Sequence, residues 1–242
     1  MPSKTQFWRT ITGLVLFAIA FGYVEAAVVA YLRSIYTPLR AHFYPPSSAG
    51  ELFPLLTLDQ LRVLGPEHTV RLNTELGREL ATMLMLSGVA LVAARKPREW
   101  IAAFVLCFGI WDITFYGSLK LLLNWPASLM TWDILFLLPV PWVGPVIAPI
   151  LVSVSMIVAG FYGLWREYNE NPFPMTRARW AFIGFGGLLV FLAFIYDFPN
   201  TARGGNPNAF RWDIFLVGEG IAVLALLSAV WRRRARRGAE KG

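Results

Sequence analysis

Long apolar runs, separated by short segments that carry basic residues, constrain this sequence more than any other feature. One run is "ITGLVLFAIAFGYVEAAVVAYL" at Ile11–Leu32, and another is "IAVLALLSAVW" at Ile221–Trp231. About 20 apolar residues cross a bilayer as a helix. Charged residues make up 15% of the chain, whereas soluble domains carry about 25%. We therefore expect an all-α, polytopic integral membrane helical bundle.

The apolar runs predict six transmembrane helices in a single transmembrane domain that covers residues 1–242. In the predicted outer loop 34–72, Thr57 is expected to cap a short helix at Leu58–Leu64 that ends at Gly65-Pro66. The outer segment "TWDILFLLPV" at 131–140 is too short to cross a bilayer. We expect it to form a re-entrant or interfacial half-helix. The expected spans are 11–32, 73–94, 100–123, 143–165, 180–198 and 210–231.

The distribution of Lys and Arg predicts the orientation in the membrane. With the N-terminus in the cytoplasm, the inside segments carry 14 of the 22 basic residues. Both termini are then cytoplasmic, and a bacterial inner membrane is the expected location. The basic tail "RRRARRGAEK" would attract anionic lipid headgroups. Membrane lipids are the expected partners and nucleic acid is not, while a homo-oligomer or a larger membrane complex stays open.

The triplet Trp-Asp-Ile occurs three times, with its aspartates at 112, 133 and 213. Thr131 and Asn208 are good N-cap residues, so Asp133 and Asp213 are expected in the first turn of a helix. Asp112 instead falls near the centre of a span. A charge at that depth costs several kcal/mol on a lone helix, so Asp112 must face protein, water or a bound partner.

Acidic residues of four different spans fall at similar depth in the outer leaflet. In one span Glu75, Arg78 and Glu79 share a helix face through their i, i+3 and i, i+4 spacing. An intramembrane ionisable residue is by default a hypothesis for a functional site. We assign catalytic roles, as acid, base or metal ligand, to Asp112, Glu79, Glu25 and Glu219. We assign substrate binding to Arg78, Lys120, Tyr116, Glu75 and Asp133.

Acids outnumber bases in this predicted cluster, so protons or a cation would have to balance the charge. A divalent metal is one candidate cofactor, and its identity stays open. His42 and His68 in the outer loop, with Glu67 or the buried acids, are a second candidate metal site. The alternative is a buried polar network that only fixes helix packing.

Several activities are excluded by residues that the sequence lacks. No histidine falls inside a predicted span, which excludes a buried bis-histidine haem. The last span has no lysine, which excludes a retinal Schiff base there. No GxSxG, HExxH or P-loop motif occurs.

Three functions remain. The first is a membrane enzyme that acts on a lipid or isoprenoid-linked headgroup from the outer side, with Arg78 and Lys120 binding an anionic group. The second is a small carrier coupled to a cation or proton, and the third is a non-catalytic subunit of a membrane complex. The inner halves of the spans, such as "VLALLSAV", are apolar. They favour a pocket that opens on one side over a path through the membrane.

Overall fold

The computed structural model describes residues 3–45 and 52–239, with side chains up to Val230. In this part of the chain, six helices are long and apolar enough to cross a membrane. The prediction of an all-α polytopic bundle is therefore confirmed. The six are α1 (Lys4–Phe43), α3 (Pro66–Ala93), α4 (Pro97–Leu123), α5 (Ile147–Tyr168), α6 (Arg177–Ile195) and α8 (Trp212–Ala239).

Local sequence signals set most helix starts. The Ser3 side chain accepts a hydrogen bond from the Gln6 N–H at 3.1 Å and caps α1. Thr176 caps α6 in the same way. Both α3 and α4 have a proline in their first turn, where a missing N–H costs nothing. The short helix α2 (Leu58–Leu64) carries the predicted Thr57 cap, completed by Gln60 as a capping box.

The outer loop is shorter in the structure than the predicted loop 34–72. Helix α1 continues to Phe43 and α3 already begins at Pro66. A helix does not have to end where its apolar run ends, because the backbone hydrogen bonds continue while one face still finds contacts. Arg40 illustrates this, since it is buried and donates to the Phe53 carbonyl at 2.7 Å. Residues 46–51 of this loop are outside the described part.

The predicted half-helix 131–140 is wrong. The structure has a β-hairpin there, in which β1 (Trp132–Phe136) pairs antiparallel with β2 (Trp142–Pro145). Aromatic and β-branched residues favour a strand, and Pro139 and Pro141 lack the N–H that a helix needs. Thr131 is not an N-cap; its hydroxyl accepts from the Ser128 N–H. The Trp142 indole donates to the Leu138 carbonyl at 2.7 Å across the turn.

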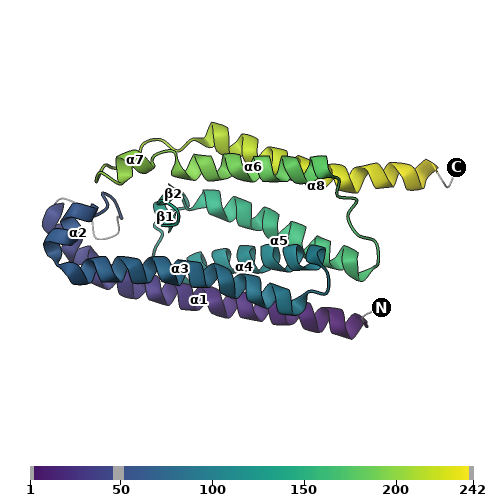
Figure 1. The fold of residues 1–242 in the computed structure, drawn as a ribbon, viewed down its shortest axis with the longest axis horizontal. Coiled ribbons are helices and arrows are strands. Elements are labelled where there is room, and N and C mark those ends of the chain that lie inside the picture. Colours follow the sequence, from purple (N-terminus) through teal and green to yellow (C-terminus); the bar gives the residue numbers. More distant parts are fainter. Residues whose placement is uncertain (1–2, 46–51, 240–242) are drawn as a thin grey trace.

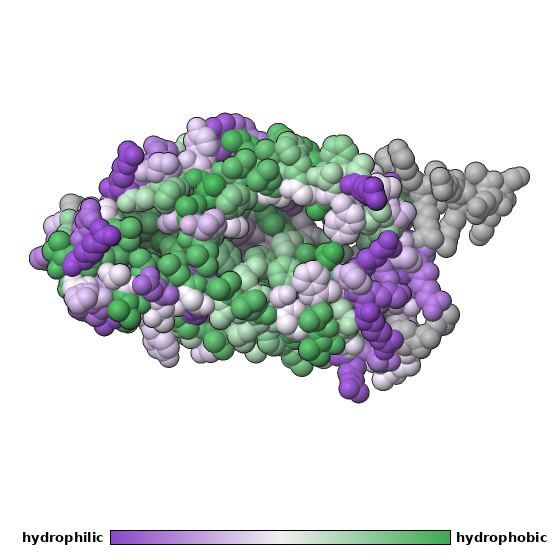
Figure 2. Space-filling model, viewed as in Figure 1, coloured by the Kyte–Doolittle hydropathy of each residue, from purple (hydrophilic) through white to green (hydrophobic). Residues whose placement is uncertain are grey.

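The helices lie roughly parallel in a long bundle (Figure 1). Helices α1, α3, α4 and α5 pack together, and α6 and α8 form a pair on the far side of α5. Both ends of the described chain lie at one end of the bundle, while α2, the hairpin and the short helix α7 (Phe198–Thr201) lie at the other. Apolar side chains form a broad middle zone between more hydrophilic ends (Figure 2), as expected for a membrane-spanning protein.

The main core lies between α1, α3 and α4. It contains the fully buried Leu86, Leu106 and Cys107. Helices approach closely at glycines, for example where a Cβ on Gly160 of α5 would lie 2.6 Å from the Ala102 carbonyl oxygen of α4. Strand β2 in turn contacts α5 and α6, which places the hairpin at its end of the bundle.

Candidate functional site

Asp112 lies in the middle of α4 and faces protein. Its side chain is buried, and the Ser153 hydroxyl of α5 donates a hydrogen bond to its Oδ2 at 2.8 Å. Ser153 is almost completely buried as well. The bond links α4 to α5, so this carboxyl contributes to helix packing whatever else it does.

Asp133 is the centre of a second group of polar side chains. It lies on β1 and is 3% exposed. The Tyr116 hydroxyl of α4 donates to its Oδ2 at 3.0 Å, and Arg33 of α1 approaches its Oδ1 at 3.8 Å. Asp133 also lies close enough to Asp112 for their charges to interact. Burial raises the pKa of Asp133 to about 6, against the opposing effect of the Arg33 guanidinium.

Arg33 links this group to a cavity at the end of the bundle that carries the hairpin. Its guanidinium carbon lies 3.8 Å from the centroid of the Trp125 ring, a cation–π contact. The cavity has a volume of about 940 Å³. Around Arg33 its wall is built from residues of α1, of the segment after α4 and of the segment before α8, among them Thr37, Asn124, Trp125, Thr131 and Asn206.

A third group joins α1 to α3. Arg78 pairs with Glu25 of α1 and with Glu75 one turn earlier in α3. The Thr82 hydroxyl donates to the second oxygen of Glu25 at 3.2 Å. These side chains are mostly buried, with exposed fractions of 10% for Glu25, 15% for Glu75 and 22% for Arg78. One base thus stands between two carboxylates, as the shared helix face predicts for Glu75 and Arg78.

Glu79 connects this third group to the hairpin. Both of its carboxylate oxygens accept from the Leu137 backbone N–H, at 3.0 and 2.9 Å. Glu79 also lies close enough to Glu75 and Arg78 for their charges to interact with its carboxylate. The carboxylate therefore satisfies a backbone donor just after β1 and holds the hairpin against α3.

Two of the predicted site residues lie apart from these groups. Lys120 is exposed and donates to the Asn124 and Pro126 carbonyls at the end of α4, at 3.4 and 3.1 Å. Glu219 of α8 lines a different cavity, near Ser155 of α5. The structure thus places the nine predicted residues in several places. Arg78, Glu25, Glu75 and Glu79 form one continuous group, and Asp112, Tyr116 and Asp133 form another.

The three Trp-Asp-Ile triplets have three different environments. Asp112 is at mid-helix, Asp133 is on a strand, and Asp213 is in the first turn of α8 as predicted. The Asn208 cap is wrong, because α8 begins only at Trp212. Asn208 instead binds the Asp197 carboxylate through its backbone and side-chain N–H groups.

The described side chains that could bind a metal do not lie together. Within residues 3–45 and 52–239, no three His, Cys, Asp or Glu side chains lie close enough to form such a site. His68 is buried, with its Nε2 3.6 Å from Glu67 and its ring edge-on to Tyr36. His42 packs against Phe43. The two histidines thus have separate ring contacts.

Arg33, Ser153 and Thr82 were not predicted as site residues from the sequence. Arg33 follows directly after the apolar run that ends at Leu32, so it falls outside both the predicted span 11–32 and the predicted loop 34–72. Arg33 lies four residues after Val29, one helical turn further along α1. This spacing is the signal that would have placed Arg33 on the same helix face as Val29. Ser153 and Thr82 are small hydroxyl residues in apolar helices, and nothing in their local sequence marks them as partners of Asp112 and Glu25.

Searches of protein-family models, of curated proteins and of solved structures found no match to this chain.

Proposed function

We propose that the protein binds a membrane lipid or isoprenoid-linked molecule by its anionic headgroup, in the cavity beside Arg33. The observation that supports this proposal most is the environment of the Arg33 guanidinium, namely its burial and its lack of a close charge partner. It is largely buried on the wall of a cavity of about 940 Å³. Among the described residues, the one ion-pair partner of Arg33 is Asp133 at 3.8 Å, which is beyond hydrogen-bond distance.

A guanidinium presents five N–H donors in a planar fork that matches phosphate and carboxylate oxygens. In the described part of the chain, Nε of Arg33 has no hydrogen-bond partner although it is buried. Trp125 covers one face of the group and holds its plane. Arg33 is therefore oriented and still has donors for an anion, which supports headgroup binding.

Chemistry on the bound headgroup is a further part of this proposal. Asp133 lies 3.8 Å from the Arg33 guanidinium, and the Tyr116 hydroxyl orients the Asp133 carboxylate through a hydrogen bond. Any transfer of a proton to or from the headgroup would fall to Asp133. The earlier candidates Asp112, Glu79 and Glu25 are engaged with Ser153, Leu137 and Arg78, so we assign them positioning roles.

We also propose that both termini are cytoplasmic and that the protein lies in a bacterial inner membrane. The basic residues at the end of the bundle that carries both termini support it. The cavity then faces the outer side. A reporter that is active only outside the cytoplasm, fused after Gly242, should be silent, and one inserted after Gly50 should be active. The opposite result would overturn the orientation.

The binding test compares two arginines on the same side. Dihexanoyl phosphatidic acid should raise the unfolding temperature of the detergent-solubilised protein, because binding at 100 times its dissociation constant adds about 2.7 kcal/mol to the free energy of unfolding. Arg33→Gln should lose this stabilisation, measured against its own lipid-free sample. Arg62→Gln should keep it, because Arg62 is exposed and pairs with Asp59.

A second variant leaves Arg33 in place. Thr37→Trp should fill the cavity and also abolish the effect of the lipid. Equal stabilisation by dihexanoyl phosphatidylcholine, or an undiminished effect in both Arg33→Gln and Thr37→Trp, would refute the proposal.

A further inference from the structure

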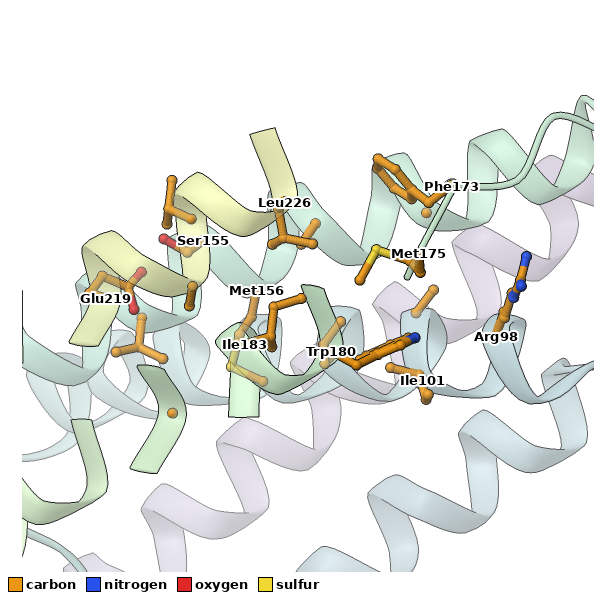
Figure 3. A pocket seen from close by; sticks show the side chains of 18 of the residues that line it. Arg98, Ile101, Ser155, Met156, Phe173, Met175, Trp180, Ile183, Glu219 and Leu226 are labelled. Carbon is orange, nitrogen blue, oxygen red and sulfur yellow. The ribbon is translucent and has the colours of Figure 1, made fainter. Parts of the chain in front are cut away.

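A separate groove of about 370 Å³ lies between α4 and α5 on one side and α6 and α8 on the other. Its walls are almost entirely apolar and include Met156, Met175, Phe173 and Trp180 (Figure 3). Its size falls within the range of small-molecule sites, about 300–1,000 Å³. Methionine side chains adapt to varied apolar shapes, so this wall suits a bulky apolar body.

One carboxyl group interrupts this apolar lining. Glu219 projects from α8 beside Ser155 of α5 (Figure 3), and the Ser155 hydroxyl hydrogen-bonds it. Its Oε1 is buried and has no hydrogen-bond partner in the described part of the chain. A buried oxygen of this kind is costly unless a ligand satisfies it.

The other charged residues of the groove are far from Glu219. Arg98 lies at the opposite end (Figure 3). Glu167 also lines the groove, and it is paired with Lys96 at 3.6 Å. Arg98 is the one basic residue among the described lining residues. A counter-charge for an ionised Glu219 would therefore have to come from the occupant.

We propose that this groove binds a lipophilic cation, an amine or a quaternary onium group with an apolar body, whose charge lies against Glu219. A carboxylate in apolar surroundings is stable when a cation stands beside it. The apolar body would lie along the methionines, and Trp180 offers an aromatic face. The positive charge of Arg98 at the far end orients the ligand with its cation toward Glu219. This goes beyond the headgroup cavity, which is a different site and favours anions.

The test uses tetraphenylphosphonium as the cation and triphenylphosphine oxide as a neutral compound of similar shape. Binding to the full-length protein in nanodiscs is measured by equilibrium dialysis, with empty nanodiscs subtracted. Wild type should bind the cation more tightly than the neutral compound. Glu219→Gln should weaken cation binding about tenfold or more, the loss expected when one charged pair is removed. Asp213→Asn is the matched control on the same helix, because Asp213 is exposed and pairs with Arg211, and it should bind as wild type.

A second measurement keeps Glu219 and therefore does not depend on the folding of Glu219→Gln. In a Cys107→Ser background, a single cysteine at Ala159 of the groove should react with a thiol reagent. Tetraphenylphosphonium should slow that reaction, and triphenylphosphine oxide should not at the same concentration. Equal binding of both compounds, equal protection by both, or undiminished cation binding in Glu219→Gln would overturn the proposal.

Discussion

Gly186 of α6 and Gly218 of α8 pack directly against each other. A Cβ added to Gly186 would lie 2.5 Å from the Gly218 carbonyl oxygen, and one added to Gly218 would lie 2.7 Å from the Gly186 carbonyl oxygen. No real Cβ approaches backbone this closely, so both positions require glycine. The neighbouring Gly184, Gly187 and Gly220 have open space at the same position. Two glycines thus set the distance between α6 and α8.

Substituting Gly218 by alanine should therefore destabilise the helix pair. Overpacking of this kind costs about 1–3 kcal/mol. Gly220→Ala is the matched control, two residues away on the same helix, and should be neutral or stabilising because alanine favours a helix. Thermal unfolding in detergent measures both. Equal unfolding temperatures for the two variants would contradict the close contact.

Removing the positive charge of Arg78 should leave Glu25 and Glu75 without their shared partner. Breaking a buried ion pair costs about 3–5 kcal/mol when it is fully buried, and less here because Arg78 is 22% exposed. Arg78→Met should lower the free energy of unfolding, and adding Glu25→Leu should restore part of it. A double-mutant cycle measures the coupling. Additive effects of the two changes would show that the pair contributes little.

The stability of the protein should depend on pH through Asp133. Its folded-state pKa is raised from 3.8 to about 6, so the folded state binds the proton more tightly than the unfolded state. Its contribution is therefore fully present below pH 3.8 and is lost as the pH rises through about 6. Wild type should lose stability over this interval relative to Asp133→Asn, which cannot titrate. Parallel pH profiles of the two proteins would contradict this assignment.

The fold could be predicted because bilayer thickness converts directly into a length of apolar sequence. This is why the six helices agree with the six apolar runs, and why Thr57 could be assigned as a cap from its immediate neighbours. The ends of α1 and α3 could not be predicted in this way. There the helix continues through polar residues such as Arg33 and Arg40, whose partners come from other segments.

The hairpin and the grouping of the acids depend on tertiary contacts. Strands of four and five residues give little periodicity, and Trp132–Phe136 carries its polar residue facing Tyr116 and Arg33. Depth along a helix predicts at which level a carboxyl lies but not which neighbour it faces. Glu219 has a depth similar to that of Glu79, yet α8 pairs with α6, so Glu219 faces a different cavity. The sequence could not supply this pairing, because it depends on glycines that touch only in three dimensions.

The hairpin should be a roof in the outer leaflet rather than a solvated loop. Single cysteines from Ala127 to Val140, in a Cys107→Ser background, can be labelled with a membrane-impermeant thiol reagent. Leu129, which is 53% exposed, should react quickly, whereas position 133 should react slowly because Asp133 is buried. Rapid labelling at every position would show a solvated loop.

The bond from the Leu137 N–H to Glu79 should hold this roof in place. Glu79→Leu removes the acceptor and leaves a backbone donor unpaired, which costs about 1–3 kcal/mol. If that cost appears as local opening, labelling of a cysteine at Leu135 should accelerate by about tenfold or more, since 1.4 kcal/mol corresponds to a factor of ten. Glu79→Gln keeps an acceptor oxygen and should label close to the wild-type rate. The comparison separates the hydrogen bond from the charge: acceleration in both variants would mean that the charge of Glu79 holds the hairpin, and acceleration in neither would mean that the hairpin is held by its own strand pairing.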